Sequence, residues 1–299
     1  MLRAGGDAPH GRPWAMTSEV IAPVTQGFYS AAMSELSVQT LLETKLVTLR
    51  DVACRGSCRH RSPEECTSAT HMVFPYRGVY VRHLGRSEAV AEANQVLFFN
   101  RGESYQISHP VAGGDACLSL ELAEPLKAEW APREPKEQRR RIAPTAQSLL
   151  AQLRHRLVQK AIGILEAETQ VLALARSVLG EGTPRGTPGK QKLVERAKLV
   201  LSCDLTRRWT LADIAAEVGV SPVYLTQLFK QVEGIPLYQY QMRSRMARAL
   251  DLLGRGRAVD DISALSMDLG FSSHSHFTAT FRRAYGRTPV EYLRSIRRR

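Results

Sequence analysis

The sequence has no long apolar run. No window in its 299 residues approaches the length and hydrophobicity of a membrane-spanning helix. The N-terminus contains Arg3 but lacks the apolar core of a secretion signal. Cysteine is also scarce, and an odd count of five in a long chain does not suggest a disulfide framework. We therefore expect a protein of the reducing cytoplasm, with no membrane partner.

Sequence patterns of catalysis are missing as well. We find no Ser/His/Asp set, no phosphate-binding loop and no pair of carboxylates at a useful spacing. A binding protein is therefore expected rather than an enzyme, with no catalytic residue and no cofactor.

Acidic residues are fewer than basic ones, 29 against 41, and the net charge is +12. The imbalance is concentrated at one end of the chain. Residues 190–299 carry 19 Lys and Arg against 10 Asp and Glu, whereas the first 189 residues carry 22 against 19. A basic C-terminal domain joined to a nearly balanced one is typical of a protein that binds phosphates with one part only.

The basic region contains two segments of similar design, residues 205–240 and 256–293. Each predicts a short helix, a turn at a glycine (Gly219 or Gly270) and a second helix that a serine begins (Ser221 or Ser272). Glycine tolerates the left-handed conformation that ends a helix, and serine is a good N-cap. This is the design of a helix-turn-helix, whose second helix can enter the major groove of DNA.

Residues 237–253 predict a helix that joins the two segments. Its apolar residues follow helical spacing, with Arg243, Arg245 and Arg248 mostly on other faces. Seventeen residues make a rod of roughly 25 Å. Such a rod could hold two recognition helices about one DNA turn apart, roughly 34 Å, in successive major grooves.

The helical spacing separates buried from outward residues on both predicted recognition helices. Leu225, Leu228 and Phe229 form the apolar stripe of the first, and Phe277 and Phe281 form that of the second. The predicted DNA-binding residues are Val223, Thr226, Gln227 and Lys230 on the first helix, and His274, Ser275, Thr278, Arg282 and Arg283 on the second. Gln pairs well with adenine, Thr and Ser can bond to several bases, and Lys or Arg suits guanine or phosphate. For each residue alone, a solvated surface role is an equal alternative.

The second segment resembles the AraC/XylS family of transcriptional regulators. The matching residues are Gly270, Phe271, Ser275, His276, Phe277, Phe281, Gly286, Thr288, Pro289 and Tyr292. The resemblance implies a seven-helix, two-headed DNA-binding domain that acts on double-stranded DNA and RNA polymerase. Ser266 and Ala279 depart from the family pattern. We expect the buried Ser266 hydroxyl to be satisfied within its own helix. The short Ala279 side chain favours phosphate contacts over base reading at the second head.

Residues 36–130 predict several short strands, which suggest a barrel or a sandwich. The family resemblance implies a cupin-like sensor barrel here. Two roles for it remain open: a pocket for a small-molecule effector, or a filled barrel that serves only as a dimer platform.

Cysteine and histidine offer one candidate metal site in this region, Cys54-x3-Cys58-x7-Cys66-x4-His71. Three thiols and an imidazole could hold zinc, but the spacing fits no strong zinc pattern, and inert cysteines are the favoured interpretation. His71, His83 and His109 are isolated in the sequence, so we predict no cupin-type metal site. The cysteines also leave open an alternative function, a thiol-zinc protein of DNA alkyl-damage repair with a similar DNA-binding domain.

The predicted fold class is therefore α+β with two domains: an N-terminal cupin-like β-barrel with a helical hairpin, and a C-terminal all-α domain with two helix-turn-helix motifs. The predicted divisions are a disordered tail (1–34), the barrel (35–143), a helical dimerisation segment (144–180), a linker (181–189) and the DNA-binding domain (190–299). In the favoured interpretation, the helical segment pairs with the same segment of a second chain to form a homodimer. In the alternative interpretation, it packs on the barrel of its own chain. The run Arg139 to Arg141 predicts a solvated turn, with nucleic-acid contact as the alternative.

Overall fold

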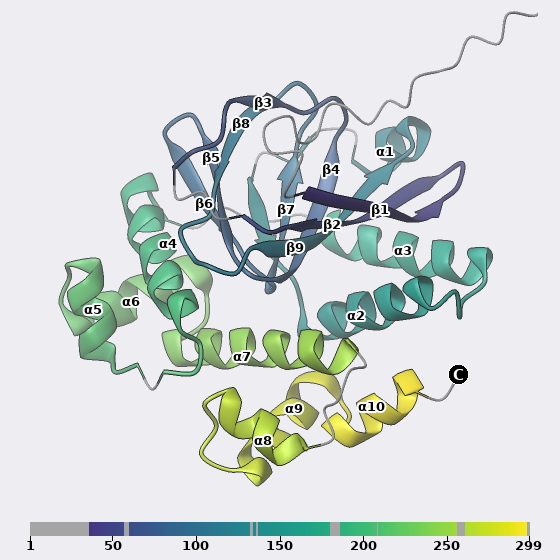
Figure 1. The fold of residues 1–299 in the computed structure, drawn as a ribbon. Helices are drawn as coiled ribbons and strands as arrows, with labels where there is room; N and C mark the ends of the chain where they lie inside the picture. The colour runs from purple at the N-terminus through teal and green to yellow at the C-terminus, as the bar shows by residue number, and fades with distance from the viewer. Residues whose placement is uncertain are drawn as a thin grey trace, which may run out of the picture.

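A computed structural model describes residues 36–56, 60–131, 134–135, 137–179, 186–207, 209–255 and 261–297. The predicted tail, Cys58 and most of the predicted linker lie outside these residues. Figure 1 shows two parts, a β-rich N-terminal domain with two covering helices and an all-helical C-terminal domain. Within the described residues, no helix combines the length and the apolar character that crossing a bilayer would require.

The N-terminal domain contains two antiparallel sheets. The larger has the strand order β1-β2-β9-β4-β7-β10 and the smaller the order β3-β8-β5-β6. The strands are β1 (Leu36–Glu43), β2 (Val47–Cys54), β3 (Glu65–Cys66), β4 (His71–Arg77), β5 (Tyr80–Leu84), β6 (Ser87–Ala91), β7 (Gln95–Phe99), β8 (Ser104–Ser108), β9 (Asp115–Leu122) and β10 (Arg139–Arg141). The predicted strand region, residues 36–130, is confirmed, and β10 lies outside it.

An apolar core lies between the two sheets. It includes Val73, Leu97 and Phe99 of the larger sheet and Tyr80 and Tyr105 of the smaller one, all buried. In the described residues the strands form two separate sheets, with no hydrogen-bonded ladder that closes them into one. The arrangement corresponds to a sandwich, and the predicted cupin-like barrel is not confirmed.

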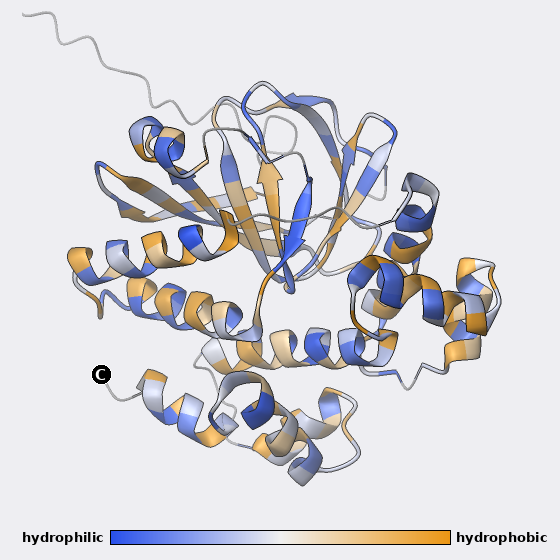
Figure 2. Cartoon of the chain, turned by 180° about the vertical axis from the view of Figure 1, so that it is seen from behind, coloured by the Kyte–Doolittle hydropathy of each residue, from blue (hydrophilic) through white to orange (hydrophobic). Residues whose placement is uncertain are grey.

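Two helices, α2 (Pro144–Val158) and α3 (Ile164–Leu179), cover the outer face of the larger sheet. A second apolar core lies here, where Leu153 and Val171 of the helices pack with Phe74 and Leu120 of the strands. Figure 2 shows apolar residues along the central strands and on both helices. Helix α1 (Glu124–Trp130) leads from β9 towards β10. The helical segment therefore packs on its own domain, the alternative that the sequence left open.

The C-terminal domain has seven helices among the described residues from 186 onwards, as the family resemblance implied. They are α4 (Pro188–Cys203), α5 (Leu211–Val218), α6 (Pro222–Glu233), α7 (Leu237–Gly254), α8 (Ile262–Asp268), α9 (His274–Tyr285) and α10 (Pro289–Arg297). Helix α4 begins at Pro188, inside the segment predicted as linker. Separate apolar cores form around α5 and α6 and around α8, α9 and α10, and α7 contributes to both.

Candidate nucleic-acid interface

The first helix-turn-helix consists of α5 and α6. Thr210 caps α5 by accepting from the Asp213 amide, while the Asp213 carboxylate accepts from the Thr210 amide at 3.1 Å. The bond from the Thr210 amide, and after it a side-chain hydrogen bond from Thr210, hold the pKa of the Asp213 carboxyl below its ordinary value. Gly219 ends α5 with φ of +80°, and Ser221 caps α6 by accepting from the Tyr224 amide at 3.2 Å. The predicted turn and cap are confirmed.

Helix α6 buries one face and exposes the other. Leu225, Leu228 and Phe229 are at most 2% exposed, as predicted. The predicted contact residues Val223, Thr226, Gln227 and Lys230 are all exposed. Their spacing of three and four residues places them along one face of the helix. Tyr224, which the sequence prediction did not select, is also exposed beside Val223.

The second helix-turn-helix consists of α8 and α9. Asp261 caps α8 by accepting from the amides of Ser263 and Ala264. Gly270 follows α8 with φ of +75°. The cap of α9 is Ser273, which accepts from the His276 amide at 3.2 Å. The predicted cap, Ser272, was therefore wrong by one residue.

The apolar face of α9 is Phe277 and Phe281, both fully buried. Ser266 is also buried, and its hydroxyl donates to the Ser263 carbonyl at 2.8 Å, within its own helix as expected. The His276 ring packs edge-on against Phe271, with ring centroids 5.3 Å apart. A packing role for His276 agrees with this contact.

The outward face of α9 carries the predicted residues of the second head. His274, Ser275, Arg282 and Arg283 are exposed, and Thr278 is half-buried. All five line a shallow hollow that Ala279 and Thr288 complete. The hollow brings two guanidinium groups together with four smaller polar side chains, an arrangement that suits a phosphate backbone and base edges.

Helix α7 joins the two heads through Arg245. Sequence spacing placed Arg245 on a face other than the apolar one. That expectation was wrong, because the side chain is buried, with 5% exposed. Its guanidinium donates to the carbonyl of Leu205 at 2.7 Å, of Arg207 at 3.0 Å and of Gly270 at 2.9 Å. The first two carbonyls precede α5, and the third lies in the turn before α9. One side chain thus fixes both heads to their connecting helix.

A buried charged cluster joins the first head to the N-terminal domain. We name it the interdomain charge cluster: Arg139 of β10, Glu195 and Lys198 of α4, and Glu233 of α6. Burial by itself would raise the pKa of Glu233, but the charges of Lys198 and then Arg139 outweigh it and lower the pKa to about 2. The Glu195 carboxylate also accepts from the Val90 amide of β6 at 2.7 Å.

The arginine run 139–141 therefore has a structural role. Arg139 pairs with Glu195 and Glu233. Arg140 pairs with Glu137 and donates to the Val178 carbonyl at 2.5 Å. Arg141 donates to the Glu233 carbonyl. The predicted solvated turn is wrong. The three arginines bind partners within the protein rather than nucleic acid.

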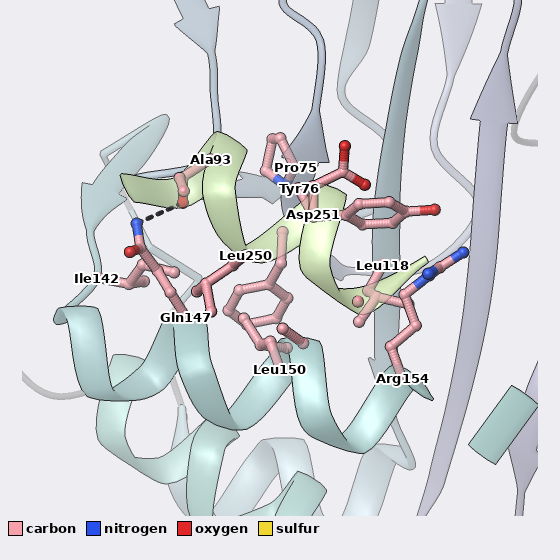
Figure 3. A pocket seen from close by; sticks show the side chains of 14 residues that line it. Pro75, Tyr76, Ala93, Leu118, Ile142, Gln147, Leu150, Arg154, Leu250 and Asp251 are labelled. Carbon is pink, nitrogen blue, oxygen red and sulfur yellow. Dashed lines mark hydrogen bonds between the residues drawn. The ribbon is translucent and has the colours of Figure 1, made fainter. Parts of the chain in front are cut away.

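A pocket lies between the domains, at the contact of α2 and α7 with β4 (Figure 3). Leu150 and Leu250 form part of its apolar wall. Its lining residues Tyr76 and Arg154 both donate to the Asp51 carboxylate, each at 2.7 Å. An occupant of this pocket would touch both domains.

Within the described residues, the candidate zinc ligands Cys54, Cys66 and His71 are not brought together. The only group of three or more metal-ligand side chains that the described residues place within reach of one ion contains neither Cys66 nor His71. Cys66 is exposed on β3. His71 is buried beside the Ser119 hydroxyl, and burial lowers its pKa to about 3. The fourth member, Cys58, lies outside the described residues.

The predicted dimer helices leave one apolar corner exposed. Ile164 and Leu165 at the start of α3 are 69% and 76% exposed, and Val158 at the end of α2 is 39% exposed. The remaining apolar face of α3 is covered by the larger sheet. The homodimer stays a prediction.

Comparison with known proteins places the resemblance in the C-terminal domain. Residues 214–295 match the model of a family described as "Helix-turn-helix domain". The regulatory protein PocR of Salmonella typhimurium is 32% identical over 38% of this chain and 37% of its own length. The transcriptional activator AggR of Escherichia coli is 36% identical over 33% of this chain and 36% of its own length.

Solved structures of other proteins are also similar to this chain. A transcriptional regulator from Chromobacterium violaceum, titled as a protein with an AraC-type DNA-binding domain, is 31% identical over 37% of this chain and 97% of its own, with a TM-score of 0.34. ToxT from Vibrio cholerae O395 is 11% identical over 88% of this chain and 98% of its own, with a TM-score of 0.36.

The chain spans less than half the length of the curated relatives that it matches. The matched segment is the double helix-turn-helix, and these relatives are regulators and activators by name. The alkyl-damage-repair alternative finds no support among them.

Proposed function

We propose that the whole protein is a sequence-specific DNA-binding regulator of the AraC/XylS kind, because residues 214–295 match a helix-turn-helix family and the regulator PocR is 32% identical over 38% of this chain. Its two helix-turn-helix heads bind adjacent major grooves of one duplex. The function is binding without catalysis, and a cytoplasmic location belongs to the same proposal.

One observation carries the proposal: both second helices are capped, buried on one face and exposed on the other. Ser221 and Ser273 fix the starts of α6 and α9. Each helix then presents four or five side chains that can contact bases or phosphates. The amides at both helix starts add phosphate-binding groups that need no side chain. A merely basic surface would not explain why two capped helices with exposed contact faces occur in the same chain.

The N-terminal domain is proposed to sense an effector, to form a homodimer, or to do both. The pocket at the α2–α7 contact supports sensing, because its walls come from both domains. The exposed corner around Ile164 and Leu165 supports a dimer contact, because large apolar side chains at this exposure favour a partner surface. RNA polymerase is the further partner that the family resemblance implies.

Selection from a random duplex library with the full-length protein tests the proposal. We expect enrichment of a bipartite sequence whose halves lie about 10 base pairs apart, one helical turn. Substituting Gln227 should change one half of the enriched sequence, and substituting Arg282 should change the other. A folded protein that enriches no sequence over random competitor would refute the proposal.

A further inference from the structure

Three side chains that are far apart in the sequence meet at one end of the larger sheet. Cys54 ends β2, and it lies directly opposite Asp115, the first residue of β9. His109 comes from the loop between β8 and β9, and its Nε2 lies 2.7 Å from Asp115 Oδ1. Each of the three side chains has one possible metal-ligand atom that lies within 4.8 Å of those of the other two.

The backbone holds this cluster tightly. The Gly56 amide donates to Cys54 Sγ at 3.3 Å, and a Cβ on Gly56 would lie 2.6 Å from the His109 ring. A Cβ on Gly114, which has φ of +65°, would lie 2.2 Å from the Cys54 carbonyl oxygen. Neither glycine therefore accepts a larger residue, and both segments pass close against the cluster.

A thiolate, an imidazole and a carboxylate are the three side-chain ligands that zinc uses. Zinc bond lengths of about 2.0 to 2.3 Å place neighbouring ligand atoms of a tetrahedral site roughly 3.3 to 3.8 Å apart. Small side-chain rotations would bring the three donors to that spacing. The thiolate argues against magnesium and calcium, which prefer oxygen ligands.

We propose that Cys54, His109 and Asp115 form a binding site for a zinc-class divalent metal ion. Asp115 is buried, while Cys54 and His109 are half-buried, so the cluster can be reached by an ion from solvent. Binding releases to solvent the thiol proton of Cys54 and the proton that His109 shares with Asp115, and it leaves a fourth coordination position for water or another ligand.

The metal-bearing loop and the start of the DNA-binding domain pack on the same apolar cluster. Val111, two residues after His109, packs on a small cluster of Val79, Val81 and Val90. Leu199 of α4 packs on the same three valines. An ion bound by His109 and Asp115 is therefore linked to α4 through these shared apolar neighbours. This coupling, unlike the metal site itself, rests on the proposed function.

Cobalt titration of the purified full-length protein tests the site, because a thiolate bound to Co²⁺ gives a charge-transfer absorption. We expect one equivalent of Co²⁺ to bind with this absorption and Zn²⁺ to displace it. Cys54→Ser should abolish the band, and Asp115→Asn should weaken Zn²⁺ binding at least about tenfold. Cys66→Ser, which removes an exposed thiol elsewhere, should change neither result. A missing band in the wild type, or an equal loss in Cys66→Ser, would overturn the proposal.

Two further measurements keep the result interpretable. Zn²⁺ should raise the Tm of the wild type and of Cys66→Ser but not of Cys54→Ser, which also reports whether each variant is folded. DNA affinity is then compared with and without Zn²⁺. Metal binding with no change in DNA affinity would leave the site in place and refute the coupling, whereas a protein that binds Co²⁺ but no DNA would refute the proposed function alone.

Discussion

The Arg245 guanidinium donates to the Gly270 carbonyl across 2.9 Å, while the same group donates to the Leu205 carbonyl at 2.7 Å. Leu205 precedes the first head and Gly270 lies inside the second. The relative placement of two DNA-binding helices therefore depends on one buried side chain of α7. Arginine suits this task because its planar guanidinium carries five donors in a fixed geometry.

Arg245→Lys should loosen both heads at once. Lysine keeps the charge but cannot reach three carbonyls in fixed directions, so we expect a loss of about 2 kcal/mol in the free energy of unfolding. Affinity for a two-part DNA site should fall more than affinity for either half. Denaturation and binding to full and half sites measure the two effects. Arg248→Lys is the matched control, since Arg248 is half-buried and pairs only locally with Asp251; an equal loss there would contradict the interpretation.

Two glycines with the same backbone conformation offer a second test. Gly270 has φ of +75° and Gly286 has φ of +73°. A Cβ at Gly270 would lie 2.4 Å from the Thr206 carbonyl oxygen, whereas a Cβ at Gly286 would meet nothing within 4 Å. Gly286→Ala should therefore cost only the conformational strain, about 1 kcal/mol, and Gly270→Ala clearly more. Thermal unfolding of both variants measures the difference, and equal Tm values would show that the close approach has no energetic weight.

The interdomain charge cluster predicts a dependence of stability on pH. The pKa of Glu233 is lowered from 4.5 to about 2 in the folded protein. A lowered pKa means that the folded state favours the ionised carboxylate. Its stabilising contribution is therefore complete above pH 4.5 and is lost as the pH falls from 4.5 towards 2.

Glu233→Gln isolates this contribution from that of other carboxylates. The variant leaves Lys198 buried with one neutralising partner fewer, so we expect it to be less stable at pH 7 by on the order of 3 kcal/mol. The difference from wild type should shrink as the pH falls below 4.5. Urea unfolding across this range measures it. Glu217→Gln on the exposed side of α5 should show no such pH-dependent difference; a gap between wild type and Glu233→Gln that stays constant with pH would refute the assignment.

The C-terminal domain was predictable because its determinants are local. Gly219, Ser221 and the apolar stripe of α6 lie within twelve residues of one another, and each acts through neighbours in the chain. The error at Ser272 shows the limit of this argument: two adjacent serines can each cap a helix, and only the backbone conformation selects Ser273.

The unpredicted features depend on residues far apart in the sequence. Arg139 looked solvated because its partners Glu195 and Glu233 lie 56 and 94 positions away. His109 looked isolated for the same reason, since its neighbour Cys54 enters only through the pairing of β2 with β9. Arg245 donates to backbone carbonyls, and because every residue has one, the sequence does not show which carbonyls will accept. Strand pairing and buried polar contacts therefore needed the structure, whereas helix periodicity and capping did not.

The outward faces of the two heads predict two separable effects on DNA binding. Gln227→Ala removes a side chain that can pair bidentately with adenine, so discrimination at one base pair should fall by about 2 kcal/mol with little change in salt dependence. Arg283→Ala removes a phosphate contact, so binding to every sequence should weaken and the slope of log K against log salt should decrease by about 0.9. Binding assays over single-base variants at several salt concentrations measure both quantities. Arg101→Ala, an exposed arginine between β7 and β8, should leave both unchanged. If both variants lost affinity equally for all sequences, Gln227 would be a phosphate contact rather than a base contact, because only a base contact distinguishes one duplex from another.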